Sequence, residues 1–529
     1  MQLTGEQIVG ANLNSSGKST FQAVNPESGE TLSPEFFEAS IDEIERAASL
    51  AERDFDAFRK MSNEERAHFL DTIAEEIMAL GDALIERGMA ETGLPQARLV
   101  GERGRTVGQL KLFAEVVREG SWAEARIDTA LPDRQPLPKP DVRMMNVALG
   151  PVAVFGASNF PFAFSVAGGD TASALAAGCP VVVKGHPAHP GVSEMVGRAI
   201  QTAVQKCSLP EGVFSLVQGS RVEVGETLVQ HPAIKAVGFT GSFRGGKALF
   251  DLAAARPEPI PVYAEMGSAN PVFILPKSLK NRGDAIAQGL AGSITLGVGQ
   301  FCTNPGLTLS QSGEEFEILQ KKLAQAIDEL PAGTMLHQGI KNAYDAGFQT
   351  AQGVAGVTQV AGAQENGDKN CQGAPRLLRT DGNTFLEQES LEEEIFGPAS
   401  LLVACDSREQ MLRVAENLHG HLTATIHGED DELTDYADLL AILERKVGRI
   451  IFNGYPTGVE VCHSMMHGGP FPATTDSRTT SVGTAAIKRF LRPVSYQDFP
   501  QAMLPPPLQN QNPDNQWRLV NGAWTQENV

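Results

Sequence analysis

The chain has 529 residues, of which 42% are hydrophobic and 20% are charged, a composition typical of folded proteins with roughly two to four domains. Its formal net charge of −21 at pH 7 argues against a nucleic-acid partner or an anionic membrane surface. The N-terminus lacks a secretion-signal pattern, no apolar run approaches the roughly 18 residues of a membrane span, and the cysteines form no close pair. We therefore expect reduced thiols, a cytoplasmic location and no membrane partner.

Residues 40–130 are predicted to be helical. Capping boxes, in which a serine precedes a glutamate by three residues, indicate helix starts at Ser40 and Ser62. Amphipathic runs follow at 41–58 and 65–88.

From residue 151 short apolar runs alternate with helical stretches. Such alternation favours parallel sheets covered on both faces, the α/β class. Helices are expected at 164–178 and 191–205. The predicted strands form two series: 152–156, 181–185, 213–219, 236–241 and 262–267, then 271–276, 401–406, 423–428 and 448–454.

Two series of strands imply two α/β domains with a boundary near residue 268. We assign residues 1–130 and 150–267 to the first domain and 268–478 to the second. Extended segments at 131–149 and 488–505 are predicted to form an arm. Exposed arms pair between subunits, so we expect a homodimer or homotetramer. The polar, Pro-rich residues 506–529 are expected to be a loosely ordered tail.

Two residues suggest thioester chemistry. Cys302 lies in the glycine-bracketed turn GQFCTNPG, and Glu265 ends the predicted strand VYAE. A thiol nucleophile and a carboxylate that activates water are the groups needed to make and then break a thioester. The alternative for Cys302 is a small buried hydrophobic residue, which is what most single cysteines are.

Polar residues also follow neighbouring predicted strands. Asn159, after 152–156, could donate to an oxyanion or simply occupy a turn. Lys184, at the end of the next strand, could reach a ribose or phosphate or remain solvated. Ser242 and Gly246 stand where a helix begins after a strand, a place that suits a pyrophosphate but is also an ordinary turn.

Three further patterns limit the interpretation. The fingerprint GxGxxG is absent from the sequence, so a standard Rossmann assignment is not supported. The segment EEIFGP, 393–398, is on its own an acidic helix start. His463 and His467 beside Cys462 have loose metal-ligand spacing, and we favour a pocket or core role with no resident metal.

The order of the motifs decides between these alternatives. From about residue 20 to about 500, the chain carries ASNFP, VVVKGHP, FTGSFRGG, AEMGSANP, GQFCTNPG, EEIFGP and GGPFPATT. This ordered set resembles the aldehyde dehydrogenase superfamily. The resemblance implies two parallel-sheet α/β domains, the first a Rossmann-type cofactor domain without GxGxxG, the second catalytic, and a small oligomerisation arm.

The resemblance also implies roles for single residues. Cys302 would attack the aldehyde carbon, Asn159 and the Cys302 backbone N–H would hold the oxyanion, and Glu265 would activate water. Lys184, placed with the catalytic set, would also bind the adenine ribose. The other implied cofactor-binding residues are Ser242, Gly246, Gly267, Glu394 and Phe396.

Several positions depart from the usual family pattern. Ser268 replaces a glycine, and Ser158 replaces an aromatic residue beside the oxyanion hole. Pro187 replaces the glutamate of NAD-preferring members, which removes a carboxylate that would repel a 2′-phosphate. Arg221 is a possible phosphate partner, or else an exposed loop arginine. We therefore favour NADP, with NAD possible.

The resemblance implies an aldehyde substrate, and a finer resemblance indicates its class. The segments PTGVEV and GGPFPATTD are similar to an NADP-linked branch that includes enzymes for 2,5-dioxopentanoate and for fatty aldehydes. We favour oxidation of 2,5-dioxopentanoate to 2-oxoglutarate; Arg103, Arg105 and Lys111 are the candidate cations for its carboxylate, and we select Arg105. The apolar Phe160 and Phe164 suit a broad or long-chain aldehyde dehydrogenase equally. A Cys-dependent esterase or hydrolase is the alternative of another class.

Overall fold

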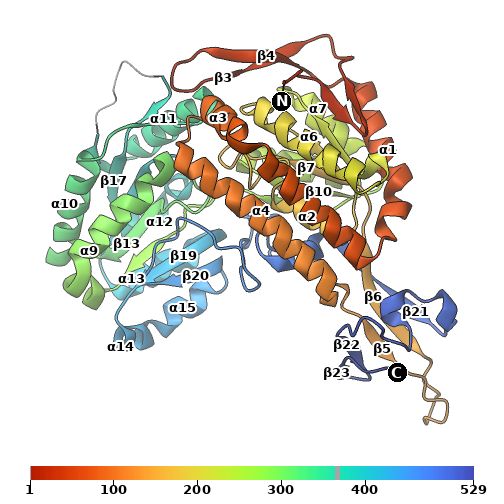
Figure 1. The fold of residues 1–529 in the computed structure, drawn as a ribbon. Helices are drawn as coiled ribbons and strands as arrows, with labels where there is room; N and C mark the ends of the chain where they lie inside the picture. The colour runs from red at the N-terminus through yellow and green to blue at the C-terminus, as the bar shows by residue number, and fades with distance from the viewer. Residues whose placement is uncertain (1, 364–369) are drawn as a thin grey trace.

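The computed structural model describes residues 2–363 and 370–529 (Figure 1). Two seven-stranded sheets form the centres of two α/β units, and a five-stranded sheet forms a separate arm. The predicted α/β class with parallel sheets is confirmed. Among the described residues, no helix combines the length and the apolar character needed to cross a membrane.

The first sheet has the order β11-β10-β7-β8-β9-β1-β2, and the strands from β11 to β9 are parallel. Each strand predicted in the first series is present. Strands β1 and β2 add an antiparallel edge that the sequence did not reveal. The strands are β1 (Gln7–Val9), β2 (Asn12–Asn14), β7 (Val152–Phe155), β8 (Val181–Lys184), β9 (Phe214–Val217), β10 (Ala236–Thr240) and β11 (Val262–Glu265).

Helices cover both faces of this sheet because its strands are apolar on both sides. Val152 and Val154 point into one core, whereas Ala153 and Phe155 point into the other, as the period of two along a strand requires. Helices α2, α4, α5 and α6 fill the first core, and α1, α7 and α8 fill the second. The helices are α1 (Ile41–Arg59), α2 (Asn63–Ala79), α3 (Gly81–Thr92), α4 (Gln96–Glu119), α5 (Gly169–Ala177), α6 (Pro190–Lys206), α7 (Val222–Gln230) and α8 (Phe243–Ala254).

Both capping boxes are confirmed: Ser40 and Ser62 each accept from the backbone N–H of the glutamate three residues on. Helix α5 begins at Gly169, later than the predicted residue 164. Residues 164–168 form a tight turn instead, in which a Cβ at Gly168 would lie 2.6 Å from the Ala163 carbonyl oxygen.

The second sheet has the order β15-β17-β18-β13-β12-β19-β20, parallel except for the edge strand β15. The strands are β12 (Val272–Ile274), β13 (Leu307–Gln311), β15 (Thr358–Gly362), β17 (Arg376–Asp381), β18 (Ala399–Cys405), β19 (His421–His427) and β20 (Val447–Phe452). The helices are α9 (Pro276–Thr295), α10 (Glu314–Asp328), α11 (Gln338–Gln352), α12 (Gly382–Glu387), α13 (Arg408–Asn417), α14 (Asp430–Leu433) and α15 (Ala437–Leu443). Two small sheets remain: β3 (Thr20–Val24) with β4 (Thr31–Phe37), and β14 (Gly333–Thr334) with β16 (Gln372–Gly373).

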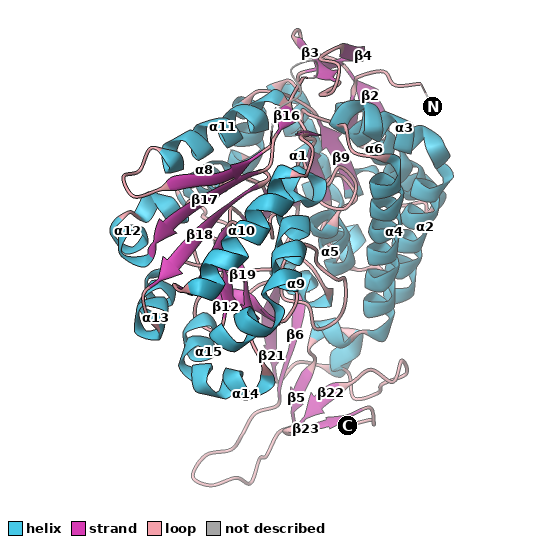
Figure 2. Ribbon diagram, turned by 90° about the vertical axis from the view of Figure 1, so that its left-hand side faces the viewer, coloured by secondary structure: helices cyan, strands magenta, loops and turns pink. Residues whose placement is uncertain are grey.

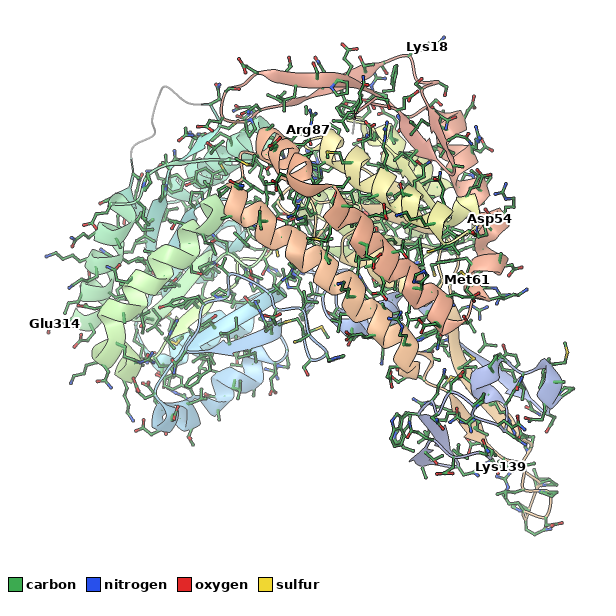
Figure 3. The ribbon with its side chains drawn as sticks, in the orientation of Figure 1. Lys18, Asp54, Met61, Arg87, Lys139 and Glu314 are labelled. Atoms are coloured by element: carbon green, nitrogen blue, oxygen red, sulfur yellow. The ribbon has the colours of Figure 1, made fainter. Side chains whose placement is uncertain are left out.

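The arm projects away from both units (Figures 1 and 2). Its strands β6 (Val142–Ala148) and β21 (Leu491–Gln497) pair antiparallel along their whole length. They belong to the two segments predicted to be extended. Lys139 lies on the loop beyond the sheet (Figure 3), where its Nζ contacts Asp128 Oδ1 at 2.9 Å.

The expectation of a loosely ordered tail is wrong. Strands β22 (Arg518–Val520) and β23 (Ala523–Thr525) form a hairpin that joins the arm sheet beside β5 (Arg126–Asp128). Arg518 is fully buried, and its guanidinium donates to the carbonyl oxygen of Glu527 at 2.8 Å. Asn521 and Gly522 make the turn with positive φ, the arrangement that an Asn-Gly pair between apolar residues favours.

Candidate active site

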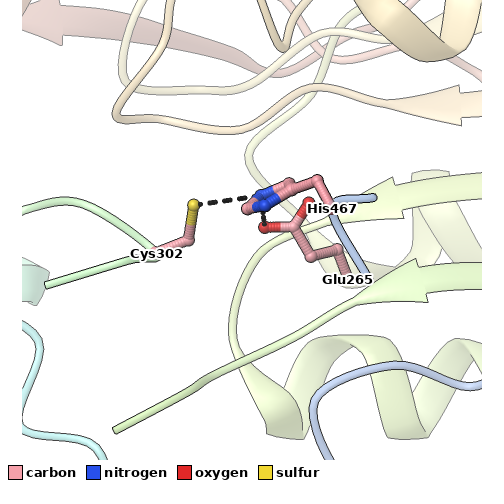
Figure 4. Close-up of side chains that lie close together, drawn as sticks. All are labelled: Glu265, Cys302 and His467. Atoms are coloured by element: carbon pink, nitrogen blue, oxygen red, sulfur yellow. Dashed lines mark hydrogen bonds and ion pairs between the residues drawn. The ribbon is translucent and has the colours of Figure 1, made fainter. Parts of the chain in front are cut away.

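Cys302, His467 and Glu265 meet between the two sheets (Figure 4). His467 Nε2 lies 2.9 Å from Glu265 Oε1 and 3.4 Å from Cys302 Sγ. Glu265 and His467 are almost fully buried, whereas Cys302 is half-buried. The imidazole therefore stands between the thiol and the carboxylate, in contact with both.

A returning segment brings His467 to this place. After β20 the chain crosses back to the first sheet, where Thr474 pairs with Glu265 at the end of β11. Met266 N donates to the Ala473 carbonyl oxygen at 2.8 Å. The hydroxyl of Ser481 donates to Glu265 Oε2 at 2.7 Å. Glu265 is thus held on one oxygen by His467 and on the other by Ser481.

The loop that carries Cys302 is fixed by groups from both neighbouring motifs. Asn270 Nδ2 donates to the carbonyl oxygens of Cys302 and Asn304, each at 2.9 Å. Gly299 has φ +63°, and a Cβ there would lie 2.2 Å from the Gly397 carbonyl oxygen. The loop therefore packs directly on the EEIFGP turn, which only glycine permits.

Asn159 lies on the other side of the same loop. Its Nδ2 donates to the carbonyl oxygen of Gln300 at 3.1 Å, two residues before Cys302. The adjoining aromatic residues form a cluster in which the ring of Phe160 packs on Phe164 and Phe301, with centroids 5.1 and 5.5 Å apart. Phe164 also faces His467. The wall beside the thiol is therefore apolar, as the sequence indicated.

Burial and charge set the protonation of the two reactive groups. Burial and the nearby charge of Glu265 raise the pKa of the Cys302 thiol well above its usual value. Burial alone would raise the pKa of Glu265 too, but His467 and the hydrogen bond from Ser481 outweigh it, so that pKa is lowered. At rest the pair is a neutral thiol and an ionised carboxylate, and the thiol must lose a proton to become a nucleophile.

Two arginines approach the thiol from outside this cluster. The charges of Arg105 and Arg449 both interact with Cys302. Arg105 Nη1 donates to the Val459 carbonyl oxygen, and Arg449 Nη2 donates to that of Gly458 at 3.0 Å. Arg105 also lines a cavity of about 450 Å³. Arg449 was not predicted as a site residue, because nothing in the sequence of its strand indicates such a role.

Lys184 ends β8 at the carboxyl edge of the first sheet. Burial lowers the pKa of its ammonium to about 8, although the charge of Glu38 opposes that shift. Within the described part of the chain the ammonium has no hydrogen-bond or ion-pair partner. A mostly buried cation left unpaired at this edge fits the phosphate or ribose of a dinucleotide.

The other expected cofactor residues lie on neighbouring turns. Ser242 is the exposed N-cap of α8 and accepts from Gly245 N at 3.2 Å. A Cβ at Gly246 would lie 2.7 Å from Met266 Cγ, so this glycine allows the helix to approach the sheet. The half-buried Phe396 lies in the turn that carries Glu394.

Gly267 and Glu394 are brought together from separate motifs. A Cβ at Gly267 would lie 2.6 Å from Glu394 Oε2, so the glycine makes room for the carboxyl group. Burial, with a smaller effect of the Glu265 charge, raises the pKa of Glu394 to about 8. The turns therefore meet in one cradle, in which the Glu394 carboxyl group fills the space beside Gly267. A carboxyl group at this place could hold a ribose hydroxyl of a dinucleotide.

Arg221 occupies a separate but adjacent position. It is the N-cap residue of α7 and lines a cavity of about 460 Å³ together with Lys18 and Glu38. Because Glu38 also acts on the charge of Lys184, this cavity lies beside the edge of the sheet that carries Lys184. This position favours the role of Arg221 as a phosphate partner over that of an exposed loop arginine without a ligand.

Comparison with known proteins gives the family. The model of the aldehyde dehydrogenase family matches residues 13–470. The chain is a member of the aldehyde dehydrogenase family. The enzyme is 55% identical to alpha-ketoglutaric semialdehyde dehydrogenase 2 of Azospirillum brasilense and 46% identical to alpha-ketoglutaric semialdehyde dehydrogenase of Acinetobacter baylyi (strain ATCC 33305 / BD413 / ADP1). Each similarity covers 99% of this chain and 99% of the relative.

Solved structures share the fold. Betaine aldehyde dehydrogenase from Staphylococcus aureus, in complex with NAD+, superposes with a TM-score of 0.80 at 18% identity, over 94% of this enzyme and 96% of that chain. Aldehyde dehydrogenase from Brucella melitensis biovar abortus 2308 gives 0.78 at 22% identity, over 94% and 97%. The predicted fold and the predicted enzyme class, an aldehyde dehydrogenase, are confirmed.

Proposed function

We propose that the enzyme oxidises 2,5-dioxopentanoate, the semialdehyde of α-ketoglutarate, to 2-oxoglutarate through a thioester on Cys302. The observation that carries the chemistry is the contact of His467 with both Cys302 Sγ and Glu265 Oε1. The names of the relatives at 55% and 46% identity support the substrate. Their chemistry and the family resemblance both named Cys302 and Glu265, and the contacts of His467 with each of them add support.

The first step is activation of the thiol. As the aldehyde carbon approaches Sγ, the S–C bond forms and the thiol proton passes to solvent. Because the ionised Glu265 only accepts hydrogen bonds, Nε2 of His467 carries its proton, and this N–H faces both Glu265 Oε1 and Cys302 Sγ. The N–H stabilises the thiolate that the raised pKa of Cys302 otherwise withholds.

The second step stabilises charge on the substrate oxygen. Asn159 Nδ2 donates to the Gln300 carbonyl oxygen on the Cys302 loop and, with the backbone N–H of Cys302, forms the proposed oxyanion hole. A nicotinamide bound here would supply the hydride acceptor for the aldehyde carbon. Lys184, Ser242 and Glu394 would hold it, with Gly246 and Gly267 leaving room and Phe396 lying against it.

The third step is hydrolysis of the thioester. Glu265, whose lowered pKa keeps it ionised, takes a proton from water while the water oxygen attacks the acyl carbon. The C–S bond breaks, and the leaving sulfur receives the proton that Glu265 took from water. The acid product leaves, the neutral thiol of Cys302 and the ionised Glu265 are restored, and one proton per cycle has passed to solvent.

We further propose NADP as the preferred cofactor, with NAD also used. Pro187 places no carboxylate near the adenine ribose, and Arg221 with Lys18 lines the adjoining cavity of about 460 Å³. Lys184 adds a third cation at the same edge of the sheet. Glu38 and Glu223 line the same cavity, so the three cations exceed its carboxylates by one charge, and this excess favours a 2′-phosphate.

Arg105 is the proposed partner of the substrate carboxylate. The charge of Arg105 interacts with Cys302, and its side chain lines a cavity of about 450 Å³. The neighbouring Arg103 instead donates to the Gly81 carbonyl oxygen at 2.6 Å, so it is the less favoured partner. Phe160 and Phe164 would pack on the carbon chain between the two ends. The charges of Glu102 and Glu460 also act on Arg105, and Glu460 lines the same cavity. The comparison of aldehydes below therefore separates the enzyme from its rival within the family, a fatty aldehyde dehydrogenase.

A Cys-dependent hydrolase would need the same three reactive side chains but none of the cofactor residues. The cradle formed by Gly267 and Glu394 and the unpaired ammonium of Lys184 favour the dehydrogenase.

For the assembly we propose a homodimer or homotetramer through the arm, and for the location the cytoplasm.

The test is an initial-rate assay of reduced cofactor with 2,5-dioxopentanoate, hexanal and longer aldehydes, run with NAD and NADP in parallel. We expect the highest kcat/KM for 2,5-dioxopentanoate with NADP. A clear preference for uncharged aldehydes would reject the substrate assignment. Ester hydrolysis without any cofactor reduction would reject the dehydrogenase. Size-exclusion chromatography with light scattering tests the assembly.

A further inference from the structure

Cys302, His467 and Glu265 combine a sulfur, a nitrogen and an oxygen ligand in one place. The three ligand atoms all lie within 4.8 Å of one another. In a tetrahedral zinc site, bond lengths of about 2.3 Å to sulfur and about 2.05 Å to nitrogen separate these two atoms by roughly 3.5 Å. Cys302 Sγ and His467 Nε2 are 3.4 Å apart, so the pair already has the spacing of zinc ligands.

Of the two remaining pairs, sulfur and oxygen lie within 4.8 Å, and nitrogen and oxygen need only a small adjustment. Nitrogen and oxygen ligands of zinc lie roughly 3.3 Å apart by the same geometry. His467 Nε2 and Glu265 Oε1 are 2.9 Å apart, so a shift of a few tenths of an ångström opens the contact. Glu265 Oε2 keeps its hydrogen bond from Ser481, which orients the carboxylate as outer groups do in metal sites.

Charge also balances at this cluster. A thiolate and a carboxylate carry the two negative charges that neutralise a divalent cation, and the neutral imidazole completes the set. The charges of Arg105 and Arg449 act on Cys302 and oppose a cation. Both arginines direct an Nη atom to a carbonyl oxygen of the 456–459 segment. The three ligand atoms, in contrast, would contact a bound cation directly, so their attraction would exceed the repulsion by the arginines.

We propose that these three residues bind one thiophilic divalent cation, Zn²⁺ above all, and that the bound ion inhibits the enzyme reversibly. Binding breaks the S–H bond, forms an S–Zn bond and releases the proton to solvent, without any change of oxidation state. A water molecule takes the open fourth position. The inhibition, though not the binding, rests on the proposed role of Cys302 as nucleophile.

A direct binding measurement tests the site without relying on activity. Full-length enzyme treated with chelator is titrated with Zn²⁺ against a chromophoric chelator, and with Co²⁺ while the thiolate-to-metal charge-transfer absorption is recorded. We expect one ion per chain and a charge-transfer band. The near-isosteric Cys302→Ser should lose the band, and His467→Gln and Glu265→Gln should each weaken Zn²⁺ binding at least tenfold.

Cys462→Ala is the matched control, since Cys462 and His463 offer the nearest competing thiol and imidazole in the sequence. It should leave binding unchanged. Equal Zn²⁺ affinity in wild type and Cys302→Ser, or loss of the band in Cys462→Ala, would overturn the proposal. Circular dichroism spectra of the variants show whether each has folded, and a second substitution, Cys302→Ala, replaces any that has not.

Activity separates this proposal from the proposed function. Zn²⁺ should inhibit aldehyde oxidation in parallel with site occupancy, and EDTA should restore it. Charge-transfer absorption with undiminished turnover would place zinc on Cys302 and refute Cys302 as the nucleophile.

Discussion

His467 Nε2 lies 2.9 Å from Glu265 Oε1, so the imidazole of a residue near the end of the chain pairs with a carboxylate of the first sheet. The ionised Glu265 only accepts hydrogen bonds, so Nε2 carries its proton, and the same N–H also faces Cys302 Sγ. The roles are therefore separate: the N–H of His467 stabilises the thiolate, and Glu265 is the base that activates water.

Replacing His467 tests this separation of roles. In His467→Phe a ring remains but the N–H donor is lost, so kcat/KM should fall about 10–100-fold, as expected for loss of a hydrogen bond to a charged group worth about 1.5–3 kcal/mol. Alkylation of Cys302 by iodoacetamide at pH 7 should slow in the same variant. Cofactor binding, measured by fluorescence titration, should change less than about threefold. Unchanged turnover would remove His467 from the mechanism.

Glu265→Gln should separate the two halves of the reaction. The amide retains the size of the carboxylate but takes no proton from water, so oxidation should proceed once and hydrolysis should stall. Stopped-flow absorbance should show a burst of about one reduced cofactor per active site and then slow turnover. Mass spectrometry of the quenched protein should find the acyl group on Cys302. Rapid steady-state turnover without a burst would assign water activation to another residue.

Ser481→Ala should change the pH dependence of the same carboxylate. The variant loses a hydrogen bond to the ionised form, so the pKa of Glu265 should rise and the acid limb of the kcat profile should move to higher pH. The stabilisation by the depressed pKa exists above the unfolded value of 4.5 and disappears as pH falls through the folded pKa. The variant should therefore lose about 1–3 kcal/mol of stability at pH 7 and less at pH 4, as measured by thermal unfolding.

The sequence revealed most of the fold and only part of the site, for identifiable reasons. Continuous apolar strands and serine–glutamate caps are local signals, and β7, β8 and α1 follow them. His467 is different. Its contact with Glu265 depends on the chain returning from β20 to β11, a long-range path that no spacing in the sequence encodes.

In the C-terminal tail, by contrast, the sequence does contain a local signal, but the polar composition around it indicated disorder. Polar and proline-rich residues in 506–517 suggested disorder, yet Asn521-Gly522 marks a hairpin turn between two short apolar runs. The burial of Arg518 against backbone carbonyl groups was beyond prediction, because charged residues are rarely buried without a paired partner.

Arg221 and Lys184 should control the choice of cofactor. Arg221→Ala should raise the KM for NADP about 10–100-fold, as expected for a charge-assisted hydrogen bond worth 1.5–3 kcal/mol, and change that for NAD less than about threefold. Arg46→Ala, on the exposed face of α1, is the control for lost surface charge. Equal effects on both cofactors would place the 2′-phosphate elsewhere.

The pH dependence of NADP binding should follow Lys184. Its pKa is lowered by burial to about 8, so the ammonium is charged below that pH and neutral above it. NADP affinity should therefore weaken as pH rises through about 8. Lys184→Met should bind NADP more weakly at pH 7 and show a flatter profile. A wild-type profile that is flat between pH 7 and 9 would contradict this role.

Arg105→Gln should change substrate preference rather than chemistry. Loss of a charged hydrogen bond costs about 1.5–3 kcal/mol, so kcat/KM for 2,5-dioxopentanoate should fall about 10–100-fold, mainly through KM. The value for hexanal should change less than about threefold, because an uncharged aldehyde makes no use of the cation. Arg103→Gln, two residues away with its side chain directed to Gly81, should leave both values unchanged. Equal losses on the two aldehydes would show instead that Arg105 acts by holding the Val459 carbonyl, and the carboxylate would then belong to Arg449.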